Sequence, residues 1–144
     1  MRAGEIWTQH AKLTADDAAG SDNFGQLVSI SEDVVIVGAP KHAGGGLKQS
    51  GAAYIFARDG ETWTQRAKLT ANDAGEKDQF GASVSIGGKV AIIGAPFNDG
   101  SAADTGAAYI FERNGDVWAQ HAKLTAEDAQ EKDQFGNAVS ISHN

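Results

Sequence analysis

The sequence contains no cysteine, and this absence excludes several kinds of chemistry. A chain without cysteine forms no disulfide framework, no thiolate metal site and no cysteine nucleophile. Proline is scarce as well, with 2 residues beside 18 glycines among 144 residues, and so many glycines are typical of a chain with frequent turns. The composition therefore favours an all-β domain.

Positive charge is also in short supply. The chain has 12 lysines and arginines against 19 acidic residues, a formal net charge of −7, and no basic cluster. Binding to nucleic acid or to an anionic membrane surface depends on positive charge, so we expect neither as a partner. No run approaches the roughly 18 apolar residues of a membrane span, and residues 1–7 lack the apolar core of a signal peptide. We therefore expect no membrane insertion.

The sequence does contain a repeat. Trp7, Trp63 and Trp118 stand at spacings of 56 and 55. The same period is kept by Phe-Gly at 24–25, 80–81 and 135–136, by Gly-Ala-Pro at 38–40 and 94–96, and by Gly-Ala-Ala-Tyr-Ile-Phe at 51–56 and 106–111. Residues 63–86 and 118–141 are identical at 18 of 24 positions. Copies this similar should be able to replace one another between chains.

Each period contains four short apolar runs separated by turn signals, which predicts four strands. The run 82–86 alternates serine with valine and isoleucine, and serine would let a backbone approach closely, so we expect an inner strand. The run 90–93 is apolar on both faces, as in a strand buried between sheets. The third run ends at 109–111, and the fourth, 63–70, carries Lys and Arg, which suits an outer edge. Four strands in such a period predict a β-propeller blade.

The short motifs also indicate a family. With Phe-Gly at 24–25 and 80–81, followed by Gly-Ala-Pro at 38–40 and 94–96, the chain resembles the FG-GAP repeats of bacterial secreted proteins and, more distantly, the integrin α-subunit propeller. The resemblance implies propeller blades, a role in binding or adhesion and an extracellular or cell-surface setting, and it brings no catalytic residues. The integrin relatives hold calcium in a loop that is only a tight turn here, so that site does not transfer.

The repeats divide the chain into about two and a half blades. We expect a lone outer strand in 1–15, one blade over 24–70, a second over 80–125, and a lone inner strand in 135–144. Each blade of a propeller buries its face on the next, so two blades alone would expose large apolar faces. We therefore predict that the chain associates with itself into a ring, unless it is a piece of a longer protein.

Pairs of aspartates recur in the links between blades, always five residues apart and two residues before Phe-Gly. They are Asp17 with Asp22, Asp73 with Asp78, and Asp128 with Asp133. Such carboxylates could bind calcium, which prefers oxygen ligands. Alternatively, each Asp accepts backbone N–H bonds that fix the turn, and the regular period favours this structural interpretation. A second calcium candidate is the set Asn98, Asp99 and Asp104 in the loop 97–105, whereas the equivalent loop 41–49 looks merely flexible.

The sequence shows no nucleotide-binding glycine motif, zinc spacing or Ser-His-Asp order, so we predict that the chain is not an enzyme. His10 and His121 occupy a solvent-facing edge position and should be ordinary surface residues. The leading hypothesis is a non-catalytic binding or structural module, with itself and a protein or glycan ligand as partners. The alternative is a calcium-dependent adhesion or carbohydrate-binding protein, in which the repeated tryptophans would stack on sugars.

Overall fold

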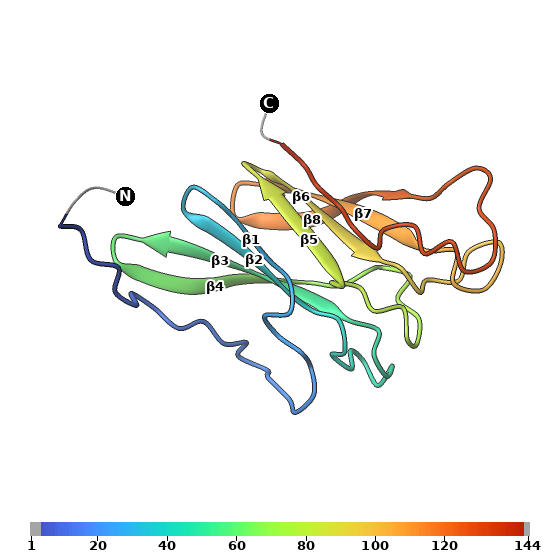
Figure 1. The fold of residues 1–144 in the computed structure, drawn as a ribbon, viewed down its shortest axis with the longest axis horizontal. Helices are drawn as coiled ribbons and strands as arrows, with labels where there is room; N and C mark the ends of the chain where they lie inside the picture. Colours follow the sequence, from blue (N-terminus) through green and yellow to red (C-terminus); the bar gives the residue numbers. More distant parts are fainter. Residues whose placement is uncertain (1–3, 143–144) are drawn as a thin grey trace.

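The computed structural model describes residues 4–142 and consists of two four-stranded antiparallel sheets (Figure 1). The first sheet contains β1 (Val28–Ser31), β2 (Val34–Ala39), β3 (Ala52–Asp59) and β4 (Thr62–Leu69), and the second contains β5 (Ser83–Gly87), β6 (Val90–Ala95), β7 (Ala107–Asn114) and β8 (Val117–Leu124). Strand order follows chain order in each sheet, which confirms the all-β fold of four-stranded blades. None of the described residues belongs to a helix long and apolar enough to cross a membrane.

The hydrophobic pattern separates central strands from edge strands. In β2, the successive residues Ile36 and Val37 are both buried although neighbouring side chains of a strand point to opposite faces. Residues of β4, by contrast, alternate between exposed and half-buried until Leu69. The apolar runs therefore lie inside each sheet, and the run with Lys and Arg lies at its outer edge, as predicted.

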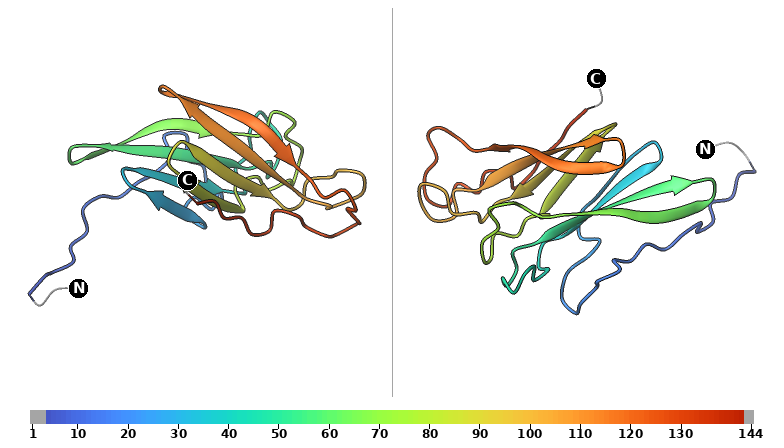
Figure 2. Two further views of the ribbon diagram at one scale, coloured as in Figure 1. Left: turned by 90° about the horizontal axis from the view of Figure 1, so that it is seen from above. Right: turned by 180° about the vertical axis from the view of Figure 1, so that it is seen from behind.

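The two sheets pack face to face, with β1 and β2 lying against β5 (Figures 1 and 2). Their contact forms the main core. The large side chains there are Ile36, Ile55 and Leu69 from the first sheet, and Phe80, Val84, Ile86, Ile93, Tyr109 and Phe111 from the second repeat. Each of them is at most 7% exposed. Burial of these side chains on a neighbouring blade holds the two repeats together.

Serine side chains link the inner strands of neighbouring repeats. Ser29 Oγ accepts a hydrogen bond from the Ile86 amide (nitrogen to oxygen 3.2 Å), and Ser31 Oγ accepts one from the Gly88 amide (3.3 Å). Only a small side chain lets the next backbone come this near. The expected role of serine on the inner strand is confirmed.

The Phe-Gly pair fastens each repeat to the one before it. The Gly81 amide donates to the Gly94 carbonyl of its own repeat, and the Phe80 amide donates to the Ser50 carbonyl of the preceding repeat, both at 3.0 Å. The Gly81 carbonyl oxygen lies so close to Gly38 that a Cβ there would be 2.1 Å from it. Phe-Gly and Gly-Ala-Pro are therefore two sides of one joint between blades.

The two terminal segments lie on the sheets without forming strands. Residues 5–15 and 137–142 have no assigned strand, so the lone strands expected in 1–15 and 135–144 are not formed within the described residues. Positions 1–3 and 143–144 of those predictions lie outside the described part of the chain. A strand needs a neighbour for its ladder of backbone hydrogen bonds. In the N-terminal segment the contacts with the first sheet include His10 Nε2 with the Glu61 carbonyl at 3.2 Å and the packing of Leu13 and Ala15 in its apolar cluster.

Candidate functional site

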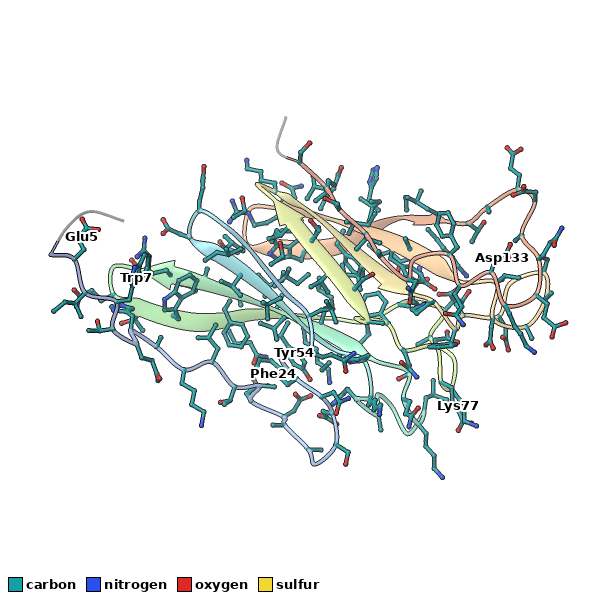
Figure 3. All side chains as sticks on the ribbon, viewed as in Figure 1. Glu5, Trp7, Phe24, Tyr54, Lys77 and Asp133 are labelled. Carbon is teal, nitrogen blue, oxygen red and sulfur yellow. The ribbon has the colours of Figure 1, made fainter. Side chains whose placement is uncertain are left out.

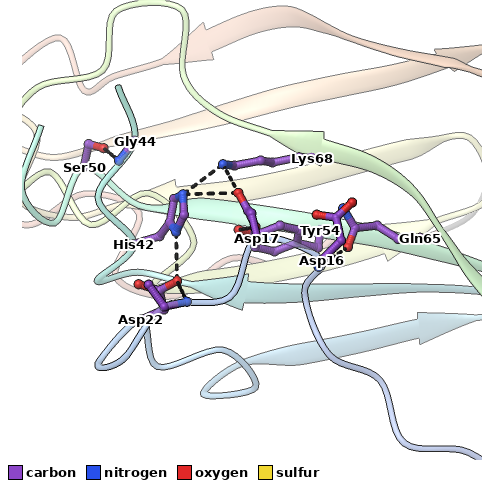
Figure 4. Close-up of polar contacts among 10 residues, drawn as sticks. Asp16, Asp17, Asp22, His42, Gly44, Ser50, Tyr54, Gln65 and Lys68 are labelled. Carbon is purple, nitrogen blue, oxygen red and sulfur yellow. Dashed lines mark hydrogen bonds and ion pairs between the residues drawn. The ribbon is translucent and has the colours of Figure 1, made fainter. Parts of the chain in front are cut away.

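The first aspartate of each pair is held by a tyrosine and a lysine of the sheet beside it. Asp17 accepts hydrogen bonds from the Tyr54 hydroxyl (oxygen to oxygen 2.7 Å) and from the Lys68 ammonium (Figure 4). The bond from Lys68 lowers the pKa of Asp17, against the effect of burial and with help from Tyr54. Burial and Asp17 together raise the pKa of Tyr54, so the hydroxyl keeps the proton that it donates.

The second aspartate fixes the turn itself. Asp22 is buried and accepts a hydrogen bond from the Ala19 amide at 3.1 Å, as the structural interpretation of the pairs predicts. It also lies 2.9 Å from Nδ1 of His42. A single carboxylate thus ties the link between blades to the loop that connects β2 with β3.

His42 is a residue of this cluster that the sequence pattern did not reveal. It is buried, and its Nε2 lies 2.8 Å from Lys68 Nζ (Figure 4). An ammonium group can only donate, so Nε2 accepts and the proton of the neutral imidazole stands on Nδ1, facing Asp22. The loop 41–49 is therefore anchored at this end rather than merely flexible. The signal that could have found His42 is its place two residues after Pro40, where the second repeat has another polar residue, Asn98.

The second repeat rebuilds the first half of the cluster unchanged. Asp73 accepts hydrogen bonds from the Tyr109 hydroxyl (2.8 Å) and from the Lys123 ammonium. Burial would raise the pKa of Asp73, but these two hydrogen bonds lower it overall. The cluster follows the period of the blades, which supports a structural role.

The second half of the cluster differs, because Asn98 takes the place of His42. Asn98 Nδ2 donates to Asp78 at 2.9 Å, and Asp78 also accepts from the Gly75 amide at 3.0 Å. Burial raises the pKa of Asp78 against the effect of these hydrogen bonds. Asn98 Oδ1 is buried and has no hydrogen-bond partner among the described residues. The asparagine therefore forms a hydrogen bond with the aspartate, whereas the histidine contacts both the aspartate and the lysine of its cluster.

The remaining predicted ligands are not brought together. Asp133 accepts from the Gln130 amide at 2.8 Å. Asp99 accepts from the Asp104 amide within their own loop at 2.9 Å. Over residues 4–142, no three Asp, Glu or His side chains are grouped closely enough to hold a metal ion. Calcium binding by these residues stays a prediction.

A second candidate surface is the outward apolar face of the first sheet. Val28 and Ile30 on β1 are 62% and 64% exposed. They line an open groove of about 510 Å³ together with Leu13, Phe24, Gly25, Ser29, Val35 and Val37. At its floor Phe24 packs on Tyr54 with ring centroids 5.6 Å apart (Figure 3). The equivalent face of the second sheet is buried against the first sheet in the main core.

The tryptophans do not behave alike. Trp63 and Trp118 are half-buried and pack against the apolar clusters of their sheets, and the Arg58 guanidinium lies 5.9 Å from the centre of the Trp63 ring. Trp7, in the N-terminal segment, is 84% exposed. Two of the three tryptophans therefore pack against the apolar clusters.

Comparison with known proteins agrees with the geometry of the joint between blades. A family model described as FG-GAP repeat matches residues 7–56, 63–111 and 118–144, which together make up most of the chain. The search of curated proteins found no match. Since the matched segments include every Phe-Gly and Gly-Ala-Pro motif, the chain belongs to the FG-GAP repeat family.

Proposed function

We propose that the chain is a non-catalytic scaffold module whose blades assemble with those of further copies into a ring that presents loops to a protein or glycan ligand. One observation carries the proposal. Val84 and Ile86 are 7% and 4% exposed because the first sheet covers them, whereas Val28 and Ile30, at the same positions of the first repeat, are largely exposed. A face that is buried in one repeat and open in the other calls for a further blade.

The loops that would meet a ligand are 41–49 and 97–105. They lie at one end of both sheets, opposite the turns between β1 and β2 and between β5 and β6 (Figures 1 and 2). They differ in sequence but are closed by equivalent hydrogen bonds. The Gly51 amide donates to the His42 carbonyl (3.0 Å), and the Gly106 amide donates to the Asn98 carbonyl (2.9 Å). A fixed base with a variable tip is the usual arrangement of binding loops on a rigid scaffold.

The absence of an enzymatic role is part of the proposal. The strongest polar cluster, around Asp17 and Tyr54, has its donors and acceptors engaged with one another. Its groups also attach the link between blades to the neighbouring sheet, and such an attachment is a structural role. We assign it to holding the blades and the loops in place.

Light scattering over a range of concentrations, with and without a calcium chelator, tests the proposal. We expect a discrete oligomer of the 15.0 kDa chain that the chelator does not change. A folded monomer at every concentration would refute ring assembly. An oligomer that dissociates with the chelator would instead favour the calcium-dependent adhesion or lectin-like function.

A further inference from the structure

We propose that copies of the chain join head to tail by segment exchange, in which a segment of one copy displaces the equivalent segment of the next copy. Residues 14–31 of one copy take the place that residues 125–142 of the other copy hold on its own second sheet. This proposal rests on the self-association proposed above and specifies the surfaces that meet. Its starting point is that Val28–Ser31 and residues 139–142 both read Val-Ser-Ile-Ser, each shortly after a Phe-Gly pair. Two equivalent segments can therefore occupy the same kind of surface.

Residues 125–142 already lie on the second sheet as the start of a further blade would. The same two hydrogen bonds recur at both places: a phenylalanine amide donates to a carbonyl of the preceding repeat, and an inner-strand amide donates to a serine hydroxyl. They are Phe80 to Ser50 and Ile86 to Ser29 between the two sheets, and Phe135 to Thr105 and Ile141 to Ser85 at the C-terminal segment, with distances between 2.9 and 3.2 Å. The surface under the C-terminal segment therefore fits a complete blade.

The C-terminal segment covers that surface only in part. Leu124 at the end of β8 is 40% exposed, whereas Leu69, its equivalent beneath the second sheet, is 3% exposed. Residues 137–142 form no strand, but β1 is backed by β2, β3 and β4. A docked first sheet brings a whole apolar face with it. Because more apolar surface leaves water, the complete blade is the better occupant.

The link before β1 already has the backbone shape that docking requires. Ser21 and Asn23 have φ angles of 72° and 61°, and their equivalents in the docked C-terminal link, Lys132 and Gln134, have 67° and 55°. Left-handed φ angles cost free energy for residues other than glycine. At Lys132 and Gln134 they come with amide hydrogen bonds to the loop between β6 and β7. The first link has the same shape without a preceding blade, so it is preorganised for one.

The N-terminal segment of the incoming copy must give way to β8 of the other copy. His10 and Leu13 contact the first sheet, and residues 6–13 repeat the sequence pattern of β8. β4, the equivalent strand of the next repeat, lies beside β8. Ile6 is 85% exposed, and residues 6–13 belong to no strand. β8 is paired with β7 from Val117 to Leu124 with one bulge. The paired strand therefore keeps the shared place.

Exchange predicts that one substitution at two equivalent positions has opposite effects. Ile30→Glu charges the incoming β1 and should weaken self-association at least about tenfold, a difference of roughly 1.4 kcal/mol. Ile141→Glu charges only the segment that must leave, so it should strengthen self-association by a similar factor. Val117→Glu is the matched control, because Val117 is 65% exposed and its equivalent, Thr62, stays exposed beside the second sheet. Sedimentation equilibrium gives the dissociation constants, and thermal melts confirm that each variant is folded.

The outcomes separate this proposal from the one on which it rests. If both isoleucine substitutions weaken association, the copies stack without exchange, and only the exchange is wrong. If the wild type and Ile141→Glu both remain monomers at every concentration, self-association itself is wrong and the open face belongs to a further repeat.

A mixing experiment tests the head-to-tail direction. Ile30→Glu blocks one face, and Leu124→Glu blocks the face at the other end of the molecule. Each variant alone should be a monomer, and an equal mixture should form pairs and nothing larger, because only one productive contact remains. If Leu124→Glu alone associates like the wild type, the copies meet through two first-sheet faces, and the proposal is overturned.

Discussion

The first and second sheets are built from nearly the same repeat, yet one buries the face that the other exposes. Val84 and Ile86 lie in the main core, and Val28 and Ile30 lie on an open groove. The alternation of residues is the same on β1 and β5, so the difference comes from the neighbour. An amphipathic strand pattern therefore marks a face that can pack, and the adjoining blade decides whether it does.

The largest expected effect comes from a comparison of two single variants, in which the equivalent isoleucine is truncated in one repeat or in the other. Ile86→Ala should lower the free energy of unfolding by about 2–5 kcal/mol, as is usual when a buried isoleucine is truncated. Ile30→Ala should lower it by less than about 1 kcal/mol, the usual range for an exposed position. Urea denaturation at a concentration where the chain is monomeric measures both. Equal losses would show that the groove is filled within the single chain.

The joint between blades offers a second comparison. Gly38→Ala should destabilise the chain by about 1–3 kcal/mol, because the new methyl group would lie 2.1 Å from the Gly81 carbonyl oxygen in the packed core. Gly94→Ala should cost less, although its methyl group would lie 1.9 Å from the Gly136 oxygen and 2.3 Å from Ser83 Oγ, because the Ser83 hydroxyl can rotate. Gly136 belongs to the C-terminal segment outside the sheets, which can move away. The same urea titration ranks the pair, and a larger loss for Gly94→Ala would contradict this explanation.

Repetition made most of the fold predictable from sequence, because each strand has its apolar pattern copied at the same position. Repetition did not show which residues far apart in the chain contact one another. The segment 6–13 has the alternation of an outer strand but does not form one. His42 sits in a loop with no apolar pattern, and only the fold brings it to Asp22. The Asp pairs were visible in the sequence, but their tyrosine and lysine partners come from strands 36 to 51 residues away.

A smaller effect is expected from the hydroxyls that hold the first aspartates. Tyr109→Phe removes a hydrogen bond to Asp73 and should cost about 1 kcal/mol at neutral pH, and Tyr54→Phe is its counterpart in the first repeat. The pKa of Asp73 is lowered in the folded chain, so its contribution is present above the unfolded value of about 4 and is lost as pH falls through the folded pKa.

The hydrogen bond between Tyr109 and Asp73 should therefore make the effect of Tyr109→Phe depend on pH. Without the Tyr109 hydroxyl the folded pKa of Asp73 rises, so the stability difference between wild type and Tyr109→Phe should shrink as the pH is lowered below about 4. Thermal melts of both proteins at intervals of about one pH unit from pH 3 to pH 7, a range that includes the ordinary carboxyl pKa, measure this stability difference. A difference that grows in acid would mean that the hydroxyl does not act through the ionised carboxylate.

The smallest effect tests the single change between the two polar clusters. Asn98→His should stabilise the second repeat by up to about 1 kcal/mol, because a buried acceptor without a partner costs free energy and Asn98 Oδ1 is such an acceptor. A histidine there could donate from Nδ1 to Asp78 and accept at Nε2 from Lys123, as His42 does with Asp22 and Lys68. His42→Asn is the reverse substitution and should lose a similar amount. Melts of both variants at neutral pH decide the matter: opposite signs mean that the histidine completes the cluster, and a loss in both means that each loop is fitted to its own side chain.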